Sequence, residues 1–109
     1  MHWIPLIDEK QLDDIIAASY QKPIAIYKHS TRCSVSVMVK RGLEMDWNLD
    51  TIPAYYLDLL SYRPISNRIA QLFGIEHESP QLILVKDGKA VYHASHESIS
   101  VDDLASAVA

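Results

Sequence analysis

The sequence predicts an α/β fold in which a central mixed sheet of four strands is flanked by helices on both faces. Through residue 73 of the 109-residue chain, segments with helical spacing of apolar residues alternate with strand-like segments. Two strand-like segments then follow, joined by Asp87-Gly88, which is a strong signal for a tight hairpin. Helix-separated strands pair in parallel and a hairpin pairs antiparallel, so the sheet is expected to be mixed.

A helix and a strand are expected before the cysteine. Asp8 or a polar neighbour caps the helix, since aspartate is a preferred N-cap residue. One face of this helix carries the apolar residues Leu12, Ile15, Ile16 and Tyr20. Ahead of it, either a short extra edge strand or a cap on the core is formed by Trp3, Ile4, Leu6 and Ile7. The strand begins at Ile24 and is rich in β-branched and aromatic residues.

The middle of the chain predicts two helices separated by a strand. Polar residues 30 and 31 precede a helix with apolar spacing at Val35, Met38, Val39 and Leu43. Residues 47–53 are expected to be a connection and residues 54–59 a strand. Pro64 suits the first turn of the next helix, and Gly74 suits its end. The apolar face of that helix consists of Ile65, Ile69, Leu72 and Phe73.

The last part of the chain predicts the hairpin and a closing helix. The hairpin strands are residues 81–86 and 89–94, and Pro80 opens the first of them, where a missing N–H does least harm. The closing helix begins near Ser100, and its inner face carries Val101, Leu104, Ala105 and Val108. We expect residues 1–109 to form a single domain.

Composition excludes several classes of function. A hydrophobic content of 49% with 22% charged residues is typical of a soluble globular protein. The chain shows neither a leader pattern nor an apolar run that could span a membrane, so we expect a cytoplasmic protein with no membrane partner. A net charge of −4 and scattered cations argue against nucleic-acid binding. No set of residues has the spacing of metal ligands, so no metal is expected.

The single cysteine, Cys33, is predicted to be the catalytic residue. The strand, turn and helix pattern places it at a helix N-terminus, where unpaired N–H groups and the helix dipole favour a thiolate. Cysteines at helix starts have pKa values of roughly 3.5 to 7.5, against about 8.5 for a free cysteine. The alternative is a small buried apolar residue. With one cysteine, any disulfide chemistry involves the sulfur of another molecule.

Residues near Cys33 are candidates for tuning the thiolate. No carboxylate lies between Asp14 and Glu44, and that interval holds half of the ten cationic side chains: Lys22, Lys28, Arg32, Lys40 and Arg41. Screening limits each exposed charge pair to about 1 kcal/mol or less. Arg32 adjoins the cysteine and His29 precedes it by four residues.

Four segments resemble one family of redox proteins: Trp3-Ile4-Pro5-Leu6, Lys28-His29-Ser30-Thr31-Arg32-Cys33, Arg63-Pro64-Ile65-Ser66-Asn67 and His77-Glu78-Ser79-Pro80-Gln81. The element order, with a cysteine after a βα turn and a proline opening the hairpin, resembles the thioredoxin fold. The four segments together resemble the monothiol bacilliredoxins, the bacillithiol-system proteins of the YtxJ type, over nearly the whole chain. The family usually has proline after the cysteine, whereas this chain has Ser34.

The resemblance implies a thiol-disulfide oxidoreductase with no bound cofactor. Its partners are S-thiolated proteins and a low-molecular-weight thiol, bacillithiol or a similar one, which acts as co-substrate. Cys33 takes the small thiol from the protein, and a second small thiol regenerates it. Ser36 stands where dithiol relatives carry a resolving cysteine, which implies a monothiol route. Ser36 either donates a hydrogen bond to the thiolate or is an ordinary first-turn serine.

The resemblance also suggests residues that bind substrate. In the thioredoxin fold the hairpin proline is cis and faces the active cysteine, so Ser79-Pro80 is expected to take that place. The backbone of Ser79 is then a candidate for pairing with an extended substrate segment, with a purely structural turn as the alternative. Arg32 and Arg63 are candidates for holding a carboxylate of the small thiol, because a guanidinium suits that task.

Two other functions remain open from the sequence. One is an iron-sulfur carrier like the monothiol glutaredoxins, with Cys33 and an external thiol as ligands. It is disfavoured because Ser34 replaces the glycine that follows the cysteine in those proteins. The other is a thioredoxin-like interaction module whose thiol does not turn over. Cysteine phosphatase chemistry is disfavoured because Val39 stands where an arginine is needed.

Overall fold

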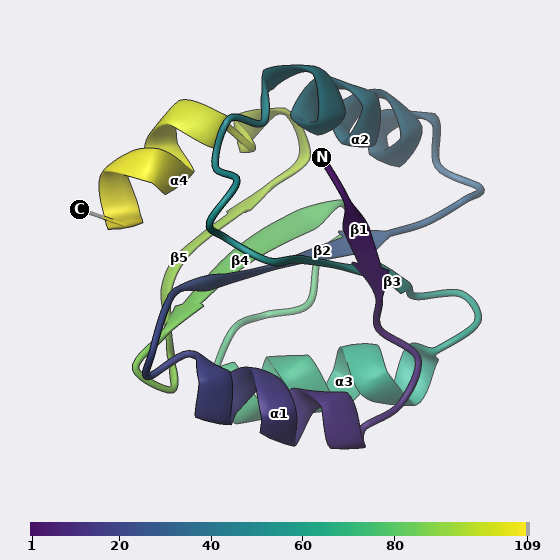
Figure 1. Ribbon diagram of the computed structural model, residues 1–109. Helices are drawn as coiled ribbons and strands as arrows, with labels where there is room; N and C mark the ends of the chain where they lie inside the picture. The colour runs from purple at the N-terminus through teal and green to yellow at the C-terminus, as the bar shows by residue number, and fades with distance from the viewer. Residues whose placement is uncertain (109) are drawn as a thin grey trace.

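The computed structural model describes residues 1–108 and shows a five-stranded sheet with helices on both faces (Figure 1). The elements in chain order are β1 Trp3–Pro5, α1 Lys10–Ala18, β2 Ile24–His29, α2 Ser34–Asp46, β3 Ala54–Asp58, α3 Arg63–Phe73, β4 Gln81–Lys86, β5 Lys89–Ser95, the short 3-10 helix η1 His96–Ser98, and α4 Val101–Val108.

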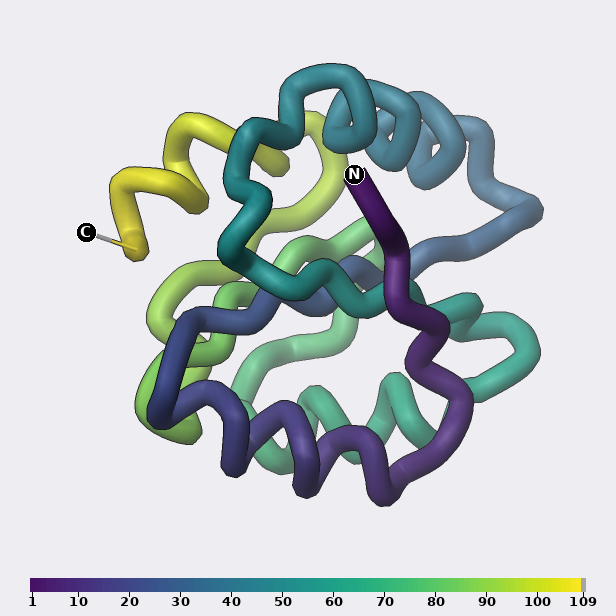
Figure 2. The backbone as a smooth tube through the Cα atoms, in the orientation of Figure 1, coloured from purple at the N-terminus to yellow at the C-terminus, as the bar shows by residue number. Residues whose placement is uncertain are grey.

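The sheet is mixed and has the strand order β1-β3-β2-β4-β5. Strands β1, β3 and β2 run parallel, and β4 and β5 pair antiparallel as a hairpin beside β2. Helices α1 and α3 cover one face and α2 and α4 cover the other, a layering that the backbone trace also shows (Figures 1 and 2). The predicted mixed sheet is confirmed, and Trp3–Pro5 adds a parallel edge strand to the four that the patterns indicate.

Strand β2 lies at the centre of the sheet and is buried along its whole length. Because side chains alternate along a strand, Ile24 and Ile26 enter the core under α1 and α3, whereas Ala25 and Tyr27 enter the core under α2 and α4. Full burial of an isoleucine contributes about 1.5 to 3 kcal/mol. The end of β2, which leads into the cysteine turn, is therefore held firmly from both faces.

Glycines and a short hairpin set the ends of several elements as predicted. Gly74 ends α3 in the left-handed conformation, with φ of 62°. Asp87 and Gly88 both have positive φ, 54° and 74°, which is the pattern of a tight hairpin turn.

Two residues predicted to lie on buried helix faces are exposed instead. Tyr20 lies beyond the end of α1 and its exposed fraction is 61%. Met38 is 66% exposed, because the inner face of α2 is occupied by Ser36 and Leu43. The spacing of apolar residues therefore predicts the wrong buried face for α2, because one of the two buried residues of the helix is a serine.

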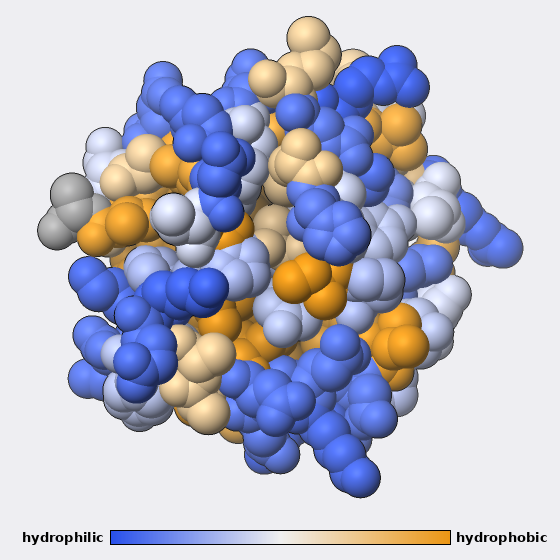
Figure 3. All heavy atoms as spheres, viewed as in Figure 1, coloured by the Kyte–Doolittle hydropathy of each residue, from blue (hydrophilic) through white to orange (hydrophobic). Residues whose placement is uncertain are grey.

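The outer surface in Figure 3 is largely hydrophilic, and the hydrophobic side chains on that face form separate patches. Within residues 1–108, no helix combines the length and the apolar character needed to cross a membrane.

Candidate functional site

Cys33 lies at the N-cap of α2, directly after the turn that follows β2. Its backbone is extended, with φ of −105° and ψ of 118°. The Cys33 N–H donates to the carbonyl oxygen of Ser30 at 3.2 Å, and its own carbonyl accepts from the N–H of Val37 at 3.2 Å. The thiol is free and partly exposed. The predicted position at a helix start is confirmed.

The first turn of α2 favours the thiolate of Cys33. The backbone N–H of Ser36 lowers the pKa of Cys33 most, and the Ser36 hydroxyl and the Val35 N–H lower that pKa further. Partial burial and the carboxylate of Glu97 act in the opposite direction. These N–H groups are the unpaired donors of a helix N-terminus, and the ionised sulfur is a much better acceptor for them than the thiol.

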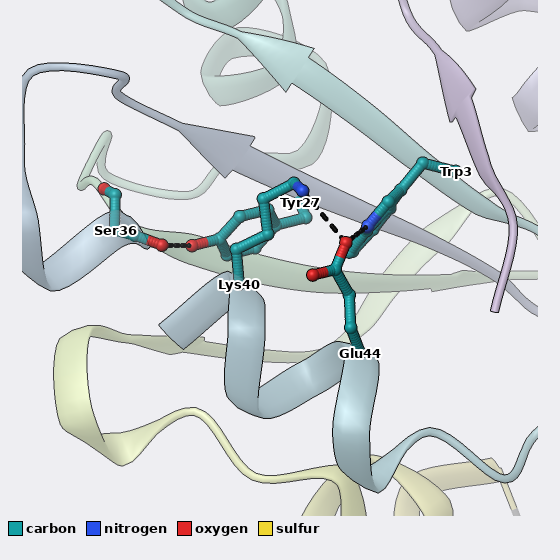
Figure 4. Close-up of polar contacts among 5 residues, drawn as sticks. All are labelled: Trp3, Tyr27, Ser36, Lys40 and Glu44. Carbon is teal, nitrogen blue, oxygen red and sulfur yellow. Dashed lines mark hydrogen bonds and ion pairs between the residues drawn. The ribbon is translucent and has the colours of Figure 1, made fainter. Parts of the chain in front are cut away.

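Ser36 is held in place by a buried tyrosine. Its side chain is fully buried, and apart from its action on the Cys33 sulfur its hydroxyl has no hydrogen-bond partner among residues 1–108. The Tyr27 hydroxyl donates to the Ser36 carbonyl oxygen at 2.8 Å (Figure 4). Burial raises the pKa of Tyr27, with a smaller contribution from Tyr56, so its hydroxyl stays protonated and remains a donor. The buried tyrosine therefore anchors the residue whose N–H lowers the pKa of Cys33, through the carbonyl on the other side of that residue.

His29 lies on the same face of the sheet and is only 4% exposed. Its ring stacks at a tilt between Tyr27 and Tyr56, with centroid distances of 5.8 Å and 5.3 Å. Burial lowers the pKa of His29, and the Lys40 charge lowers it further. The imidazole is therefore neutral at pH 7 and supplies no positive charge to the thiolate. Its Nδ1 atom is buried and has no hydrogen-bond partner among the described residues.

The five cationic residues between Asp14 and Glu44 do not all lie near Cys33. Arg32 is exposed in the turn, whereas Lys28 is fully buried and bonds to α3 on the other face of the sheet. Neither is among the groups that lower the pKa of Cys33. The N–H groups at the helix start lie close to the sulfur. The field of an exposed cation, in contrast, is screened by water and salt.

Lys28, Ser66 and His77 form a buried network that the sequence patterns do not indicate. Lys28 Nζ donates to the Ser66 carbonyl oxygen at 3.1 Å and lies 3.2 Å from His77 Nδ1. Ser66 Oγ lies 3.2 Å from the same nitrogen. Burial lowers the pKa of Lys28 to about 8. Burial also lowers the pKa of His77, and the charges of Lys28 and Arg63 lower it further.

The Ser79-Pro80 peptide bond is cis, as the thioredoxin resemblance implies. Gln81 pairs with Lys28 across the sheet, so Pro80 lies beside the end of β2 that leads to the cysteine turn. Pro80 is buried and Ser79 is half-buried. Arg63 lies exposed at the start of α3, which follows β3 at this same edge but covers the opposite face of the sheet, and its charge acts on His77. The fold thus brings Ser79 and Pro80 to the edge that carries Cys33, and Arg63 to the α3 side of the sheet.

Glu97 is a site residue that the sequence patterns missed. It lies in η1, which packs against α2, and its carboxylate raises the pKa of Cys33. The His96 N–H donates to the Pro80 carbonyl oxygen at 3.0 Å, which ties η1 to the cis-proline turn. The predicted hairpin indicates the position of Glu97. Because β5 runs antiparallel to β4, it must end at the edge of the sheet where β4 begins, and Glu97 follows that end.

A second polar cluster joins β1 to α2. Trp3 Nε1 donates to Glu44 Oε2 at 2.8 Å, and Lys40 Nζ pairs with the same oxygen at 2.9 Å. Figure 4 shows Lys40 and Glu44 extending from α2 toward Trp3. The Lys40 ammonium also lies over the Tyr56 and Trp3 rings, 5.5 Å and 5.9 Å from their centroids. These contacts fix the side chain of Lys40 and anchor the edge strand.

Residues 4–104 match the protein family described as "Monothiol bacilliredoxin BrxC". The chain belongs to the monothiol bacilliredoxin family. Membership agrees with the single cysteine at the start of α2 and confirms the family that the four sequence segments resemble. The chain has the thioredoxin fold, resembles oxidoreductases with that fold, and contains one cysteine.

Solved structures confirm the thioredoxin-like fold. A structure described as "A putative oxidoreductase with a thioredoxin fold" is 28% identical with a TM-score of 0.84, covering 96% of this chain and 92% of that one. The thioredoxin of Malassezia sympodialis is 19% identical with a TM-score of 0.72, covering 99% and 88% of the two chains. Thioredoxin from Nicotiana alata is 20% identical, with a TM-score of 0.70 and coverage of 95% and 87%. The two thioredoxins show the fold alone.

Proposed function

We propose that this bacilliredoxin removes a low-molecular-weight thiol from mixed disulfides with protein cysteines, and that Cys33 is its nucleophile. The observation that carries the proposal is the position of the free, partly exposed Cys33 thiol at the start of α2, where the N–H groups of Ser36 and Val35 favour the thiolate. Membership of the family supports bacillithiol as the small thiol and S-thiolated proteins as the partners.

The reaction consists of two successive thiol–disulfide exchanges. The Cys33 thiolate attacks the sulfur of the small thiol, a bond forms between these two sulfurs, and the bond from the small thiol to the protein cysteine breaks. The protein cysteine leaves with the electron pair as a thiolate and then takes a proton from water. A second small thiol attacks the new disulfide on Cys33, which releases the disulfide of the small thiol and restores the thiolate. The rate depends on the thiolate fraction and on the leaving thiol.

Residues around Cys33 have distinct roles in this proposal. The Ser36 N–H and hydroxyl stabilise the thiolate, which keeps it available near neutral pH. The Ser79 backbone, which makes no backbone hydrogen bond among residues 1–108, binds an extended segment of the thiolated protein beside Pro80. Arg32, exposed next to the sulfur, holds an acidic group of the incoming adduct. Arg63 has a weaker case, because it lies at the α3 side of the sheet.

Intact-mass spectrometry tests the proposal. Reduced protein is mixed with a bacillithiolated test protein, with a glutathionylated one in a parallel reaction, and the small thiol is followed over time. We expect rapid transfer from the bacillithiol adduct to Cys33, well above the rate for a free cysteine peptide, and none to a Cys33→Ser variant. Transfer no faster than to the peptide from either adduct would reject the oxidoreductase function and favour a non-catalytic interaction module.

A further inference from the structure

A hollow beside Cys33 has a composition that the exchange reaction by itself does not explain. Its volume is about 190 Å³, and it is lined by His29, Val37, Lys40, Arg41, Glu44 and Tyr56. The lining comes from three elements, the end of β2, the outer side of α2 and the middle of β3. The lining thus comes from regular secondary structure and from the end of a strand, with no long loop taking part.

The part of the hollow that α2 contributes begins one helical turn after Cys33. Val37 follows Cys33 by one helical turn and donates its N–H to the Cys33 carbonyl. Arg41 follows by one further turn on the same stripe of the helix. At 1.5 Å per residue, their Cα atoms lie roughly 6 Å and 12 Å along the axis from that of Cys33. A small molecule bonded to the sulfur can therefore extend over Val37 and reach Arg41.

The charges that line the hollow suit an anion. Glu44 is its one acidic residue, and that carboxylate already accepts from Lys40 and Trp3. Arg41 is exposed and forms no ion pair within residues 1–108. One positive charge is thus left over, on a guanidinium whose planar donors match a carboxylate.

The floor of the hollow holds a polar atom without a partner. Only 4% of His29 is exposed, and its Nδ1 atom makes no hydrogen bond among the described residues. Because this nitrogen is itself buried, it is closed to a ligand, and the charged groups that a ligand can reach in the hollow come from α2. The Tyr56 ring and the fixed Lys40 side chain complete the lining.

We propose that this hollow binds the carboxylate end of the small thiol that Cys33 takes from thiolated proteins, with Arg41 as the main anion-binding residue. The sheet order supports this division, because β3 and β4 flank β2 on opposite sides. Tyr56 of β3 then contacts the small thiol, whereas Ser79-Pro80, directly before β4, contacts the protein. The inference rests on the proposed function and names the chemical class of its co-substrate.

Two probes that differ in one group test the proposal. A test protein is linked by a disulfide either to N-succinylcysteamine, which ends in a carboxylate, or to its primary amide, which is neutral and of equal size. Single-turnover transfer to Cys33 is followed by intact-mass spectrometry for the wild type, for Arg41→Gln and for Arg68→Gln. Arg68 is exposed on α3, at the other face of the sheet, and serves as the matched control.

We expect the wild type and Arg68→Gln to take the carboxylate probe roughly fivefold faster than the amide, and Arg41→Gln to bring that ratio close to one. A ratio near one in the wild type, or an unchanged ratio in Arg41→Gln, overturns the anion site while leaving the exchange function intact. Absence of transfer from both probes contradicts the proposed function, and the anion site with it. Because both substitutions are on exposed side chains, thermal melting is expected to be unchanged in both variants.

Discussion

The hydroxyl of Tyr27, on the central strand, donates a buried hydrogen bond of 2.8 Å to the carbonyl oxygen of Ser36 in the first turn of α2. This bond joins the sheet to Ser36, and the N–H of the same residue stabilises the Cys33 thiolate. We predict that Tyr27→Phe lowers the free energy of unfolding by about 1 kcal/mol, the usual net value of one hydrogen bond. Chemical denaturation measures it, with Tyr20→Phe as control because Tyr20 is exposed. Equal effects of the two substitutions would show that the bond contributes nothing.

Ser36→Ala is predicted to separate reactivity from stability. Apart from its action on the Cys33 sulfur, the Ser36 hydroxyl has no hydrogen-bond partner among residues 1–108, so its removal is expected to change the free energy of unfolding by no more than about 1 kcal/mol. The same hydroxyl lowers the pKa of Cys33, so that pKa rises in the variant. The pH profile of iodoacetamide alkylation measures the shift, and Ser34→Ala, an exposed position in the same turn, is the control. An unchanged profile in Ser36→Ala would remove Ser36 from the thiolate's environment.

Lys28 is predicted to make stability rise with pH in the alkaline range. Its pKa is about 8 in the folded protein, against 10.5 as the ordinary value, because burial disfavours the ammonium. Between these two values the unfolded chain binds the additional proton, so the free energy of unfolding increases as pH rises through that interval. The full effect, reached above the ordinary pKa, is roughly 3 kcal/mol.

Lys28→Met provides the comparison, since it keeps an unbranched side chain that is one heavy atom shorter and removes the titration. Denaturation at pH 7.5, 9 and 10 is expected to show the wild type gaining stability relative to the variant at each step. A constant difference across the series would mean that the pKa of Lys28 is not lowered. Other titrating groups are common to both proteins, so their effects cancel in the difference.

Glu44→Ala is predicted to loosen β1 without unfolding the protein. Glu44 accepts from Trp3 of β1 and from Lys40 of α2, and the Lys40 bond is the larger cause of its lowered pKa. The stabilisation is therefore present above the ordinary carboxyl pKa and is lost as pH falls through the folded value. Hydrogen exchange at pH 7 should quicken at residues 3–6 and stay unchanged in β4 and β5. Unchanged exchange at residues 3–6 would show that packing alone holds the strand.

The sequence allowed the position of Cys33 to be predicted because its signals are local. A buried strand, a polar turn and a helical period adjoin one another, and each is recognisable within a few residues. The edge strand β1 was ambiguous for the opposite reason, since three apolar residues can equally cap a core and their partners Ala54 to Tyr56 lie far along the chain. The same distance in sequence hid Glu97, whose effect on Cys33 depends on the end of β5.

The chemistry of individual side chains was less predictable than the fold. His29 and Lys28 are neighbours in sequence, but strand alternation sends them to opposite faces, His29 to an aromatic cluster and Lys28 to Ser66 and His77. Burial makes His29 neutral, which sequence spacing does not indicate. The strand pattern around Tyr27 indicates no role for its hydroxyl, which acquires one because α2 folds back over β2.

The central claim is that the start of α2 makes Cys33 a reactive thiolate that accepts a small thiol. The most direct test is the single-turnover rate of transfer from a bacillithiolated test protein to Cys33, followed by quenched intact-mass spectrometry from pH 5 to 9. The account predicts a rate that rises with an apparent pKa below the value of about 8.5 for free cysteine and that exceeds the free-cysteine rate throughout. A rate that tracks free cysteine in both magnitude and pH dependence would contradict it.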